Sequence, residues 1–451
     1  RVHRQIRPRP GWVEHDPGEL LGNLEDLVEA AGPCAQAGLA NQGETVLAWD
    51  AVTGEPLHNA IVWQDERTED AVAGLRAAGL EALTLARAGL PLDPYFSASK
   101  LRWLLDHADG ARALLRQGRL RLGTSDAFFL HRLTGHGATD VSTASRTSLM
   151  DLRRFCWDAD LCAAFGVPMQ CLPEIRPTTG DFGTLRNGTP LVANVVDQQA
   201  ALFGHGCTRP GDIKITFGTG AFALGLTDAV PQAGAPDGLL PTCAWRLAGA
   251  APQYALDGGI LTAGTAVEWL GEIGPMQGYA GLDGFSGPSA LEQGLVFVPA
   301  LAGLGCPYWD RAARGCFLGL ELDTSPALLR RAVLEGIAFR AAELVRALQA
   351  RLGEAPRIAI DGGLSRSAFF TRFLASAIGR AVEVAGTADV TALGVLHLCL
   401  EAAGIAERPR PQGWRREEPG APLPETLHVR FRQAVAISRQ WARNQRVSAS
   451  G

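Results

Sequence analysis

Two segments of this chain, one in each half, join a short apolar run to an acidic residue and then to a helical pattern. In the first half the run 191–196 ends at Asp197 and continues as DQQAALFG. In the second half the run 357–360 ends at Asp361 and continues as DGGLSRSAFF. Strand-like segments that alternate with helical ones favour an α/β architecture. Two such halves facing each other would place these strand ends on opposite walls of a cleft, because ligands bind at the carboxyl ends of strands.

The length of the chain predicts more than one folding unit. At 451 residues it exceeds what one hydrophobic core accommodates, so two or three domains are expected. Gly-rich, strand-like runs begin again after residue 206, and we therefore expect one domain over 1–206 and a second over 207–451. The segments expected to be regular are a hairpin over 46–62, helices over 97–108, 125–133 and 325–351, and strands over 213–217, 221–226, 253–256, 295–299 and 357–360.

The C-terminal third carries two further expectations. The apolar residues at helical spacing within and just after 325–351 are Leu329, Val333, Ile337, Leu344, Leu348 and Leu352. They predict a helix that turns one stripe toward the core. Residues 406–424 are rich in Pro, Arg and Glu, and we expect a surface loop there before a final helix.

Composition excludes several classes of function. The formal net charge of −5 offers no basic field for nucleic acid or acidic membranes. No apolar run approaches the length of a membrane span and no signal-peptide pattern opens the sequence, so a cytoplasmic protein is expected. Nine scattered cysteines without a CxxC pair indicate reduced thiols. Lys100 and Lys214 are the only lysines, so neither a GxxxxGK[ST] loop nor the lysine-bearing strand of protein kinases is present.

An acid and a glycine turn follow neighbouring apolar runs. Asp197 is open to two interpretations: it caps the helix that follows, or it is a general base that takes a proton from a hydroxyl. Gln198 offers an amide to a neighbouring hydroxyl. The Gly-Thr-Gly at 218–220 is either a tight hairpin turn or a turn that approaches phosphate, and Gly362 and Gly363 form a second such turn before a helix. Together they indicate phosphoryl transfer to a hydroxyl.

Three residues in the first half form a candidate polyol site. Glu44, Trp63 and Tyr95 come from separate loops or strand ends. An aromatic ring beside a carboxylate suits a polyol, because the ring stacks on the C–H face while the hydroxyls bind acids and amides. The alternative is that Trp63 and Tyr95 are ordinary packing residues.

Longer motifs resemble the FGGY carbohydrate kinase family, and are most similar to its glycerol kinases. The motifs that carry the resemblance are PGWVEHDP at 10–17, NAIVWQ at 59–64, DPYF at 93–96, the signature YFSASKLRWLLDH at 95–107, ASRT at 144–147, GLGCPYWD at 303–310, DGG at 361–363 and VTALG at 390–394. They follow the family's order from about residue 8 to about residue 405.

The resemblance implies two actin-like, ribonuclease H-like domains around a catalytic cleft, with a polyol or sugar on the first and ATP with Mg²⁺ on the second. By matched position it implies that Asp197 is the catalytic base. The residues that it places around the polyol are Glu44, Trp63, Tyr95, Asp197, Gln198 and Phe222. Those that it places around the nucleotide are Gly218, Thr219, Gly264, Gly362, Gly363 and Ser367. It assigns no metal ligand, and it implies a homodimer or homotetramer.

The sequence departs from the family pattern at several positions. Glycerol kinases have Arg in the motif that reads Asn-Gln-Gly-Glu-Thr here, so Gly43 predicts weaker glycerol binding or a larger polyol or sugar. Ser367 stands where glycerol kinases usually have Asn. The opening strand and Asp-x-Gly-Thr loop of the family are absent from the sequence given, so we expect a truncated gene model and a first domain without a central strand. No counterpart of an allosteric Gly-Gly-Thr-Arg loop occurs in 184–190.

The expected activity is ATP-dependent phosphorylation of a hydroxyl of glycerol or a related small polyol or sugar. Three alternatives stay open. One is a kinase of another substrate of the family, such as a ketopentose. Another is a non-catalytic relic that binds sugar or nucleotide, and the third is an actin-like filament or chaperone ATPase.

Overall fold

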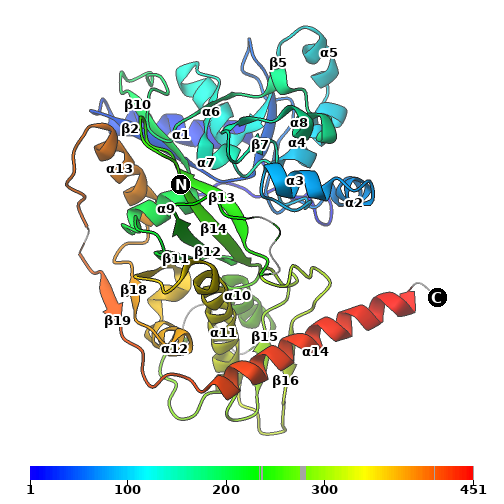
Figure 1. The fold of residues 1–451 in the computed structure, drawn as a ribbon, viewed down its shortest axis with the longest axis vertical. Coiled ribbons are helices and arrows are strands. Elements are labelled where there is room, and N and C mark those ends of the chain that lie inside the picture. The colour runs from blue at the N-terminus through cyan, green and yellow to red at the C-terminus, as the bar shows by residue number, and fades with distance from the viewer. Residues whose placement is uncertain (233, 235–236, 275–280, 411, 450–451) are drawn as a thin grey trace.

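The computed structural model describes residues 1–232, 234, 237–274, 281–410 and 412–449, and it is a mixed α/β structure with two main sheets (Figure 1). The first half of the chain contains a four-stranded sheet in the order β1-β4-β3-β5. The second half contains a seven-stranded sheet in the order β13-β14-β12-β11-β17-β18-β19. Helices cover both sheets. Among the described residues, no helix is both long and apolar enough to cross a membrane.

Among the described residues, those before 207 form ten strands, nine α-helices and one 3₁₀ helix. The strands are β1 (Glu14–His15), β2 (Ala37–Asn41), β3 (Val46–Asp50), β4 (Ala60–Ile61), β5 (Leu120–Thr124), β6 (Ala138–Asp140), β7 (Met150–Asp151), β8 (Cys156–Trp157), β9 (Glu174–Arg176) and β10 (Leu191–Val196). The α-helices are α1 (Pro17–Ala31), α2 (Glu69–Ala77), α3 (Glu81–Arg87), α4 (Ser97–His107), α5 (Ala111–Arg116), α6 (Ser125–Thr134), α7 (Val141–Ala144), α8 (Ala159–Phe165) and α9 (Asp197–Gly204). A short 3₁₀ helix covers Met169–Cys171.

The elements after residue 207 build the large sheet and its cover. The strands are β11 (Ile213–Phe217), β12 (Ala221–Thr227), β13 (Leu240–Trp245), β14 (Gln253–Ile260), β15 (Val296–Val298), β16 (Cys316–Leu318), β17 (Ile358–Gly362), β18 (Val382–Val384) and β19 (Arg415–Glu417). The α-helices are α10 (Gly264–Ile273), α11 (Pro326–Leu352), α12 (Ala368–Ile378), α13 (Val390–Ala402) and α14 (Glu425–Ala449), and a 3₁₀ helix covers Gly363–Arg366.

Strand pairing places the predicted site segments next to one another. β10 runs parallel to β2 with Val196 opposite Asn41, so the chain leaves β10 at Asp197 close to where it leaves β2. β11 runs parallel to β17 with Phe217 opposite Gly362, which brings the two glycine turns side by side. Parallel strands share their carboxyl edge, and ligands bind at that edge.

Helix α11 corrects the expectation of a single core-facing stripe. Its middle is buried on every side, and the buried residues include Glu335 and Arg340 as well as the predicted apolar ones. The reason is that α11 is enclosed by the large sheet, α10, α12 and β15. Its buried charges are paired: Arg331 Nε lies 2.6 Å from Glu335 Oε1, and Arg340 forms an ion pair with Glu343 while its Nη2 donates to Cys306 O at 2.6 Å. A helix enclosed in this way shows no polar face in its sequence.

The other predicted segments match in type, with changes in extent. The 46–62 hairpin is present, but its second strand, β4, has only two residues and meets β3 at Val46 and Ile61. The 406–424 segment is not only a loop. Its residues Arg415–Glu417 form β19, which pairs antiparallel with β18 at the edge of the large sheet. The charged side chains that suggested a loop are the kind that protect an exposed sheet edge.

Helix α13 connects the two halves of the molecule. It belongs to the second half of the chain but packs against α9 and against β2 and β10, which form a separate two-stranded parallel sheet (Figure 1). The backbones approach closely, since a Cβ on Gly394 would lie 1.8 Å from Ala200 O and one on Gly204 would lie 2.4 Å from Val390 O. One hydrophobic cluster contains Phe203 and Leu398 from both sides of residue 206. The division into domains at residue 206 therefore stays a prediction.

Candidate active site

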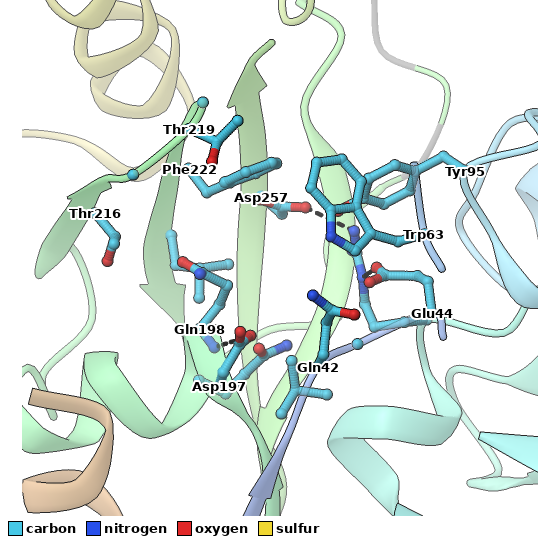
Figure 2. A pocket seen from close by; sticks show the side chains of 17 residues that line it. Gln42, Glu44, Trp63, Tyr95, Asp197, Gln198, Thr216, Thr219, Phe222 and Asp257 are labelled. Carbon is cyan, nitrogen blue, oxygen red and sulfur yellow. Dashed lines mark hydrogen bonds and ion pairs between the residues drawn. The ribbon is translucent and has the colours of Figure 1, made fainter. Parts of the chain in front are cut away.

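A cavity of about 180 Å³ lies between residues of the first half and residues of the large sheet. Figure 2 shows Glu44, Trp63 and Tyr95 on one side of it and Thr216, Thr219 and Phe222 on the other. Asp197 and Gln198 also line it. The structure therefore brings into one cavity all the residues predicted for the polyol and two of those predicted for the nucleotide, Gly218 and Thr219. The contacts of each with a ligand stay predictions.

Asp197 is the first residue of α9 and is half-buried. The N-cap interpretation is wrong, because Val196 is the capping residue and no side chain caps this helix. The Asp197 Oδ1 atom accepts the adjacent N–H of Gln198 at 2.7 Å. Burial raises the pKa of Asp197 to about 6, although the positive charge of Lys214 and the Gln198 N–H oppose the rise. A carboxylate with a pKa near the working pH suits a general base.

Three aromatic rings form a wall of the cavity. The Trp63 and Tyr95 centroids are 5.4 Å apart, and the Trp63 and Phe222 centroids are 5.8 Å apart, both edge to face. Phe222 comes from β12 of the large sheet, whereas Trp63 and Tyr95 come from loops of the first half. All three are half-buried, so each packs against protein while part of its surface remains free. Such a surface suits the C–H face of a polyol.

Arg146 is a residue of the cavity wall that the sequence interpretation missed. Its Nε lies 2.6 Å from Glu44 Oε1, and its Nη2 lies 2.8 Å from Asp257 Oδ2 on β14. It is the one cation among the described residues that line the cavity. Its Nη1 is buried and has no hydrogen-bond partner among the described residues. The ASRT motif contained Arg146, but its pairing with Asp257 joins distant parts of the chain and gave no local signal.

Burial dominates the electrostatics of this group. It raises the pKa of Glu44 and of Asp257, and in both cases Arg146 opposes the rise. Glu44 also has a φ of 59°, in the left-handed region that non-glycine residues rarely adopt. Backbone strain of this kind persists only where the surroundings hold the residue in place. The short contact with Arg146 supplies that restraint.

Gly43 leaves its part of the cavity wall without a side chain. It lines the cavity beside Val196, and a Cβ at residue 43 would lie 3.3 Å from Val196 Cγ1. The backbone at Gly43 does not require glycine, because its φ lies outside the left-handed region. The glycine therefore affects the space in the cavity rather than the path of the chain.

The turn at Gly218 and Thr219 lines the cavity and is held in place by hydrogen bonds from the start of α10. The N–H groups of Gly264 and Thr265, at the start of α10, donate to the carbonyls of Gly218 and Thr219 at 2.9 and 3.1 Å. The Gly264 N–H is therefore engaged by the turn. Glycine is required at Gly220, where a Cβ would lie 2.5 Å from Ile260 O. The sequence predicted this turn, and the structure shows that α10 supports it.

The second glycine turn lines a separate cavity. Gly362 has a φ of 95°, and a Cβ there would lie 2.2 Å from Phe217 O, so only glycine fits between the two strands. Gly363 and Ser367 line a cavity of about 280 Å³ together with Leu282, Asp283 and Arg366. The hydroxyl of Ser367 is engaged within the protein, because it caps α12 and lies 2.9 Å from Asp283 Oδ1. Whether a nucleotide occupies this cavity stays a prediction.

Asp361, the acid at the end of the second predicted strand, is turned away from both cavities. Its carboxylate lines neither cavity and instead lies 2.6 Å from His205 Nε2 in the interior. Burial by itself raises the pKa of Asp361, but the hydrogen bond from His205 and the charge of Lys214 leave it below its usual value. Among the described residues, no group of three or more His, Cys, Asp or Glu side chains forms a metal site.

Comparison with known proteins gives one family match in each half of the chain. Residues 1–204 match the N-terminal domain, and residues 213–403 the C-terminal domain, of the FGGY family of carbohydrate kinases. A glycerol kinase of Cereibacter sphaeroides is 41% identical over 455 residues, covering 96% of this chain and 92% of its own. A glycerol kinase of Geobacter sp. is 40% identical over 463 residues, covering 98% and 93%. The crystal structure of Plasmodium falciparum glycerol kinase with ADP is 29% identical, with a TM-score of 0.82 over 100% of this chain and 92% of that one.

Proposed function

The chain belongs to the FGGY family of carbohydrate kinases, and from this premise we propose how its cavity performs ATP-dependent phosphorylation of a polyol or sugar hydroxyl. One observation carries the proposal. Asp197, which can accept a proton, and the Gly218 and Thr219 turn, which can approach a phosphate, line the same cavity from two parts of the chain. Phosphoryl transfer depends mainly on positioning and charge stabilisation. This cavity combines a proton acceptor with a turn that can approach a phosphate, and each is held by a different part of the structure.

In the proposed reaction Asp197 accepts the proton of the substrate hydroxyl. The hydroxyl oxygen forms a bond to the γ-phosphorus of ATP while the bond from that phosphorus to the ADP oxygen breaks. Trp63, Tyr95 and Phe222 hold the carbon skeleton of the substrate, and Glu44 and Gln198 accept or donate hydrogen bonds to its hydroxyls. The backbone N–H groups of the turn at 218–220 face the transferred phosphoryl group.

We propose that the nucleotide extends from this turn toward the cavity lined by Gly363 and Ser367. The glycines at 220 and 362 fit this assignment, because side chains there would collide with backbone and displace both turns. Mg²⁺ would neutralise phosphate charge, and it commonly binds through substrate phosphates and water with one or two carboxylates. The described residues form no preassembled cluster for it. We therefore assign it no protein ligand.

Three observations bear on the choice of substrate. The relatives named glycerol kinase support glycerol as a substrate. Gly43 and the unpartnered Nη1 of Arg146 favour a larger one, because the first leaves space in the wall and the second leaves a hydrogen-bond donor unused. We propose that the cavity accepts polyols or ketoses longer than three carbons, and that glycerol is bound more weakly than by an enzyme with Arg at residue 43.

A substrate panel tests this proposal. We expect ATP-dependent phosphorylation of glycerol and a higher kcat/KM for one or more four- or five-carbon polyols or ketoses. The Gly43→Arg variant should reverse the order by lowering KM for glycerol and raising KM for the longer substrate. ADP release and a phosphorylated product would be measured for each compound. No turnover with any member of the panel would contradict kinase function, whereas turnover of glycerol alone would contradict only the assignment of a larger substrate.

A further inference from the structure

Lys214 is the second residue of β11, the strand that leads to the Gly218 turn. Its side chain is fully buried and does not line the cavity. The ammonium Nζ donates to Gln198 Oε1 at 2.7 Å and to Thr216 Oγ1 at 2.9 Å. It therefore joins the residue after the proposed base to the strand that carries the phosphate turn. Nothing in the local sequence distinguished Lys214 from an ordinary buried strand residue.

The groups that face Lys214 come from two strands, one helix and the segment just after that helix. They are Asp197 on α9, His205 and Cys207 just after it, Asp257 on β14 and Asp361 on β17. Burial lowers the pKa of Lys214, and the three aspartates oppose that change. The positive charge of Lys214 is the main influence that opposes the rise in the pKa of Asp197, and the Gln198 N–H is the other. The one Lys214 ammonium thus interacts electrostatically with Asp197 of the first half and with Asp257 and Asp361 of the large sheet.

We propose that Lys214 is a positioning residue for phosphoryl transfer, one that holds Asp197 and Gln198 in register with the turn at Gly218 and keeps the base ionised. The proposal rests on the assigned role of Asp197. Its geometric part follows from the hydrogen bond to Gln198, which ties the start of α9 to β11, while the bond to Thr216 fixes the ammonium on its own strand. Registration of this kind matters, because a displacement of about 1 Å between reacting groups costs about 10²-fold in rate.

The electrostatic part has a definite sign. A nearby cation favours the charged form of a carboxylate, so removing Lys214 should raise the pKa of Asp197 above its present value of about 6. The base would then be protonated over more of the neutral range. The acidic limb of the pH–rate profile should move to higher pH, while the rate at high pH recovers in part. A purely structural lysine would lower the amplitude of the profile without moving this limb.

Three variants separate these possibilities. Lys214→Met removes the charge and the hydrogen bonds at similar volume, and Lys214→Arg keeps a charge but changes its reach. Lys100→Met is the matched control, since Lys100 is the other lysine and is also fully buried. Its Nζ donates to the carbonyl of Tyr95 at 2.9 Å and is not among the groups that act on Asp197. Each variant would be purified as the full chain and compared by thermal unfolding, polyol KM and the pH dependence of kcat.

For Lys214→Met we expect the acidic limb to rise by about one pH unit and polyol KM to rise several-fold. Lys214→Arg should keep the limb within about 0.3 pH unit of wild type but raise polyol KM, because Gln198 is displaced. Lys100→Met should raise KM without moving the limb. An unchanged limb in folded Lys214→Met, or an equal shift in Lys100→Met, would overturn the proposal. If Lys214→Met does not fold, an unchanged KM in Lys214→Arg would overturn it. Inactive wild-type protein would instead contradict the proposed function.

Discussion

Arg146 carries the positive charge that balances Glu44 and Asp257 in the wall of the cavity. All three side chains are almost completely withdrawn from solvent, so their charges are screened little by water or salt. A buried carboxylate that loses its partner is either protonated or strongly destabilising. The ion pairs of Arg146 with Glu44 and Asp257 therefore make the folding stability of the protein depend on pH. This dependence is expected even when no ligand is bound.

Replacing Arg146 with Met tests this coupling at the scale of one residue. We expect the variant to lose about 3–5 kcal/mol of stability near neutral pH, the typical result of breaking a buried ion pair. The pKa values of Glu44 and Asp257, already raised by burial, rise further in the folded variant. A folded pKa above the unfolded one gives stability that is present at low pH and lost as pH rises. The deficit relative to wild type should therefore be larger at pH 8 than at pH 5, measured by thermal unfolding.

The control for that variant is Arg154→Met. Arg154 also pairs with two acids, Asp151 and Asp158, but its side chain is 57% exposed. Exposed pairs contribute about 0–1 kcal/mol, so this variant should lose little stability. Equal losses for Arg146→Met and Arg154→Met, or a deficit that does not change with pH, would contradict the description of Arg146 as a buried countercharge.

At the scale of elements, the helix pair α9 and α13 holds the proposed base in place. The two helices meet through Gly204 and Gly394, whose backbones approach until no side chain fits between them. Thr391 Oγ1, at the start of α13, lies 3.4 Å from Asp197 O. A shift of α13 would therefore move the beginning of α9, which is where Asp197 lies.

The Gly394→Ala variant should disturb this crossing. The new Cβ would lie 1.8 Å from Ala200 O, so the helices must separate. We expect a loss of about 1–3 kcal/mol, as in other overpacked sites, together with a lower kcat. Gly74→Ala in α2 is the matched control, because a Cβ there meets nothing within 4 Å and alanine favours helix. It should leave stability equal or higher by thermal unfolding. A Gly394→Ala protein as stable and active as wild type would contradict the role given to the crossing.

The same scale shows which elements could be predicted from the sequence. Helices such as α4 and α6 have periodic patterns and matched closely, because local propensity and burial agree there. The enclosed helix α11 and the edge strand β19 were described incorrectly. The burial of α11 depends on the distant elements that cover it, and the strand conformation of β19 depends on its pairing with β18. The composition of each segment alone does not indicate these contacts.

At the scale of the whole molecule, the two halves are joined around the cavity at several points. Arg146 and Asp257 pair across it, and α13 crosses α9. Elsewhere Arg311, from the second half, lies 2.8 Å from Asp93 Oδ1 and 2.7 Å from Glu66 Oε1 in the first half. These contacts fix the distance between the base and the phosphate turn.

The residues of the candidate site could be predicted where a local sequence pattern marks them, and not where their role depends on distant contacts. Asp197, Glu44, Trp63 and Thr219 were found from motifs, because each lies at a strand end or loop with a recognisable pattern. Arg146 and Lys214 were missed as site residues, because their importance comes from partners far away in the chain. The inward turn of Asp361 toward His205 was also not predictable, since the DGG pattern does not indicate which way the carboxylate faces.

The central claim is that Asp197 accepts the proton of the substrate hydroxyl, and the Asp197→Asn variant tests it most directly. Asp140→Asn is the control. Burial likewise raises the pKa of Asp140 to about 6, but its carboxylate caps α7 and does not line the cavity. Single-turnover phosphoryl transfer and polyol binding would be measured for both. We expect Asp197→Asn to lower the transfer rate by about 10²–10⁴-fold with binding retained, and Asp140→Asn to affect stability more than rate. A transfer rate in Asp197→Asn within about tenfold of wild type would contradict the claim.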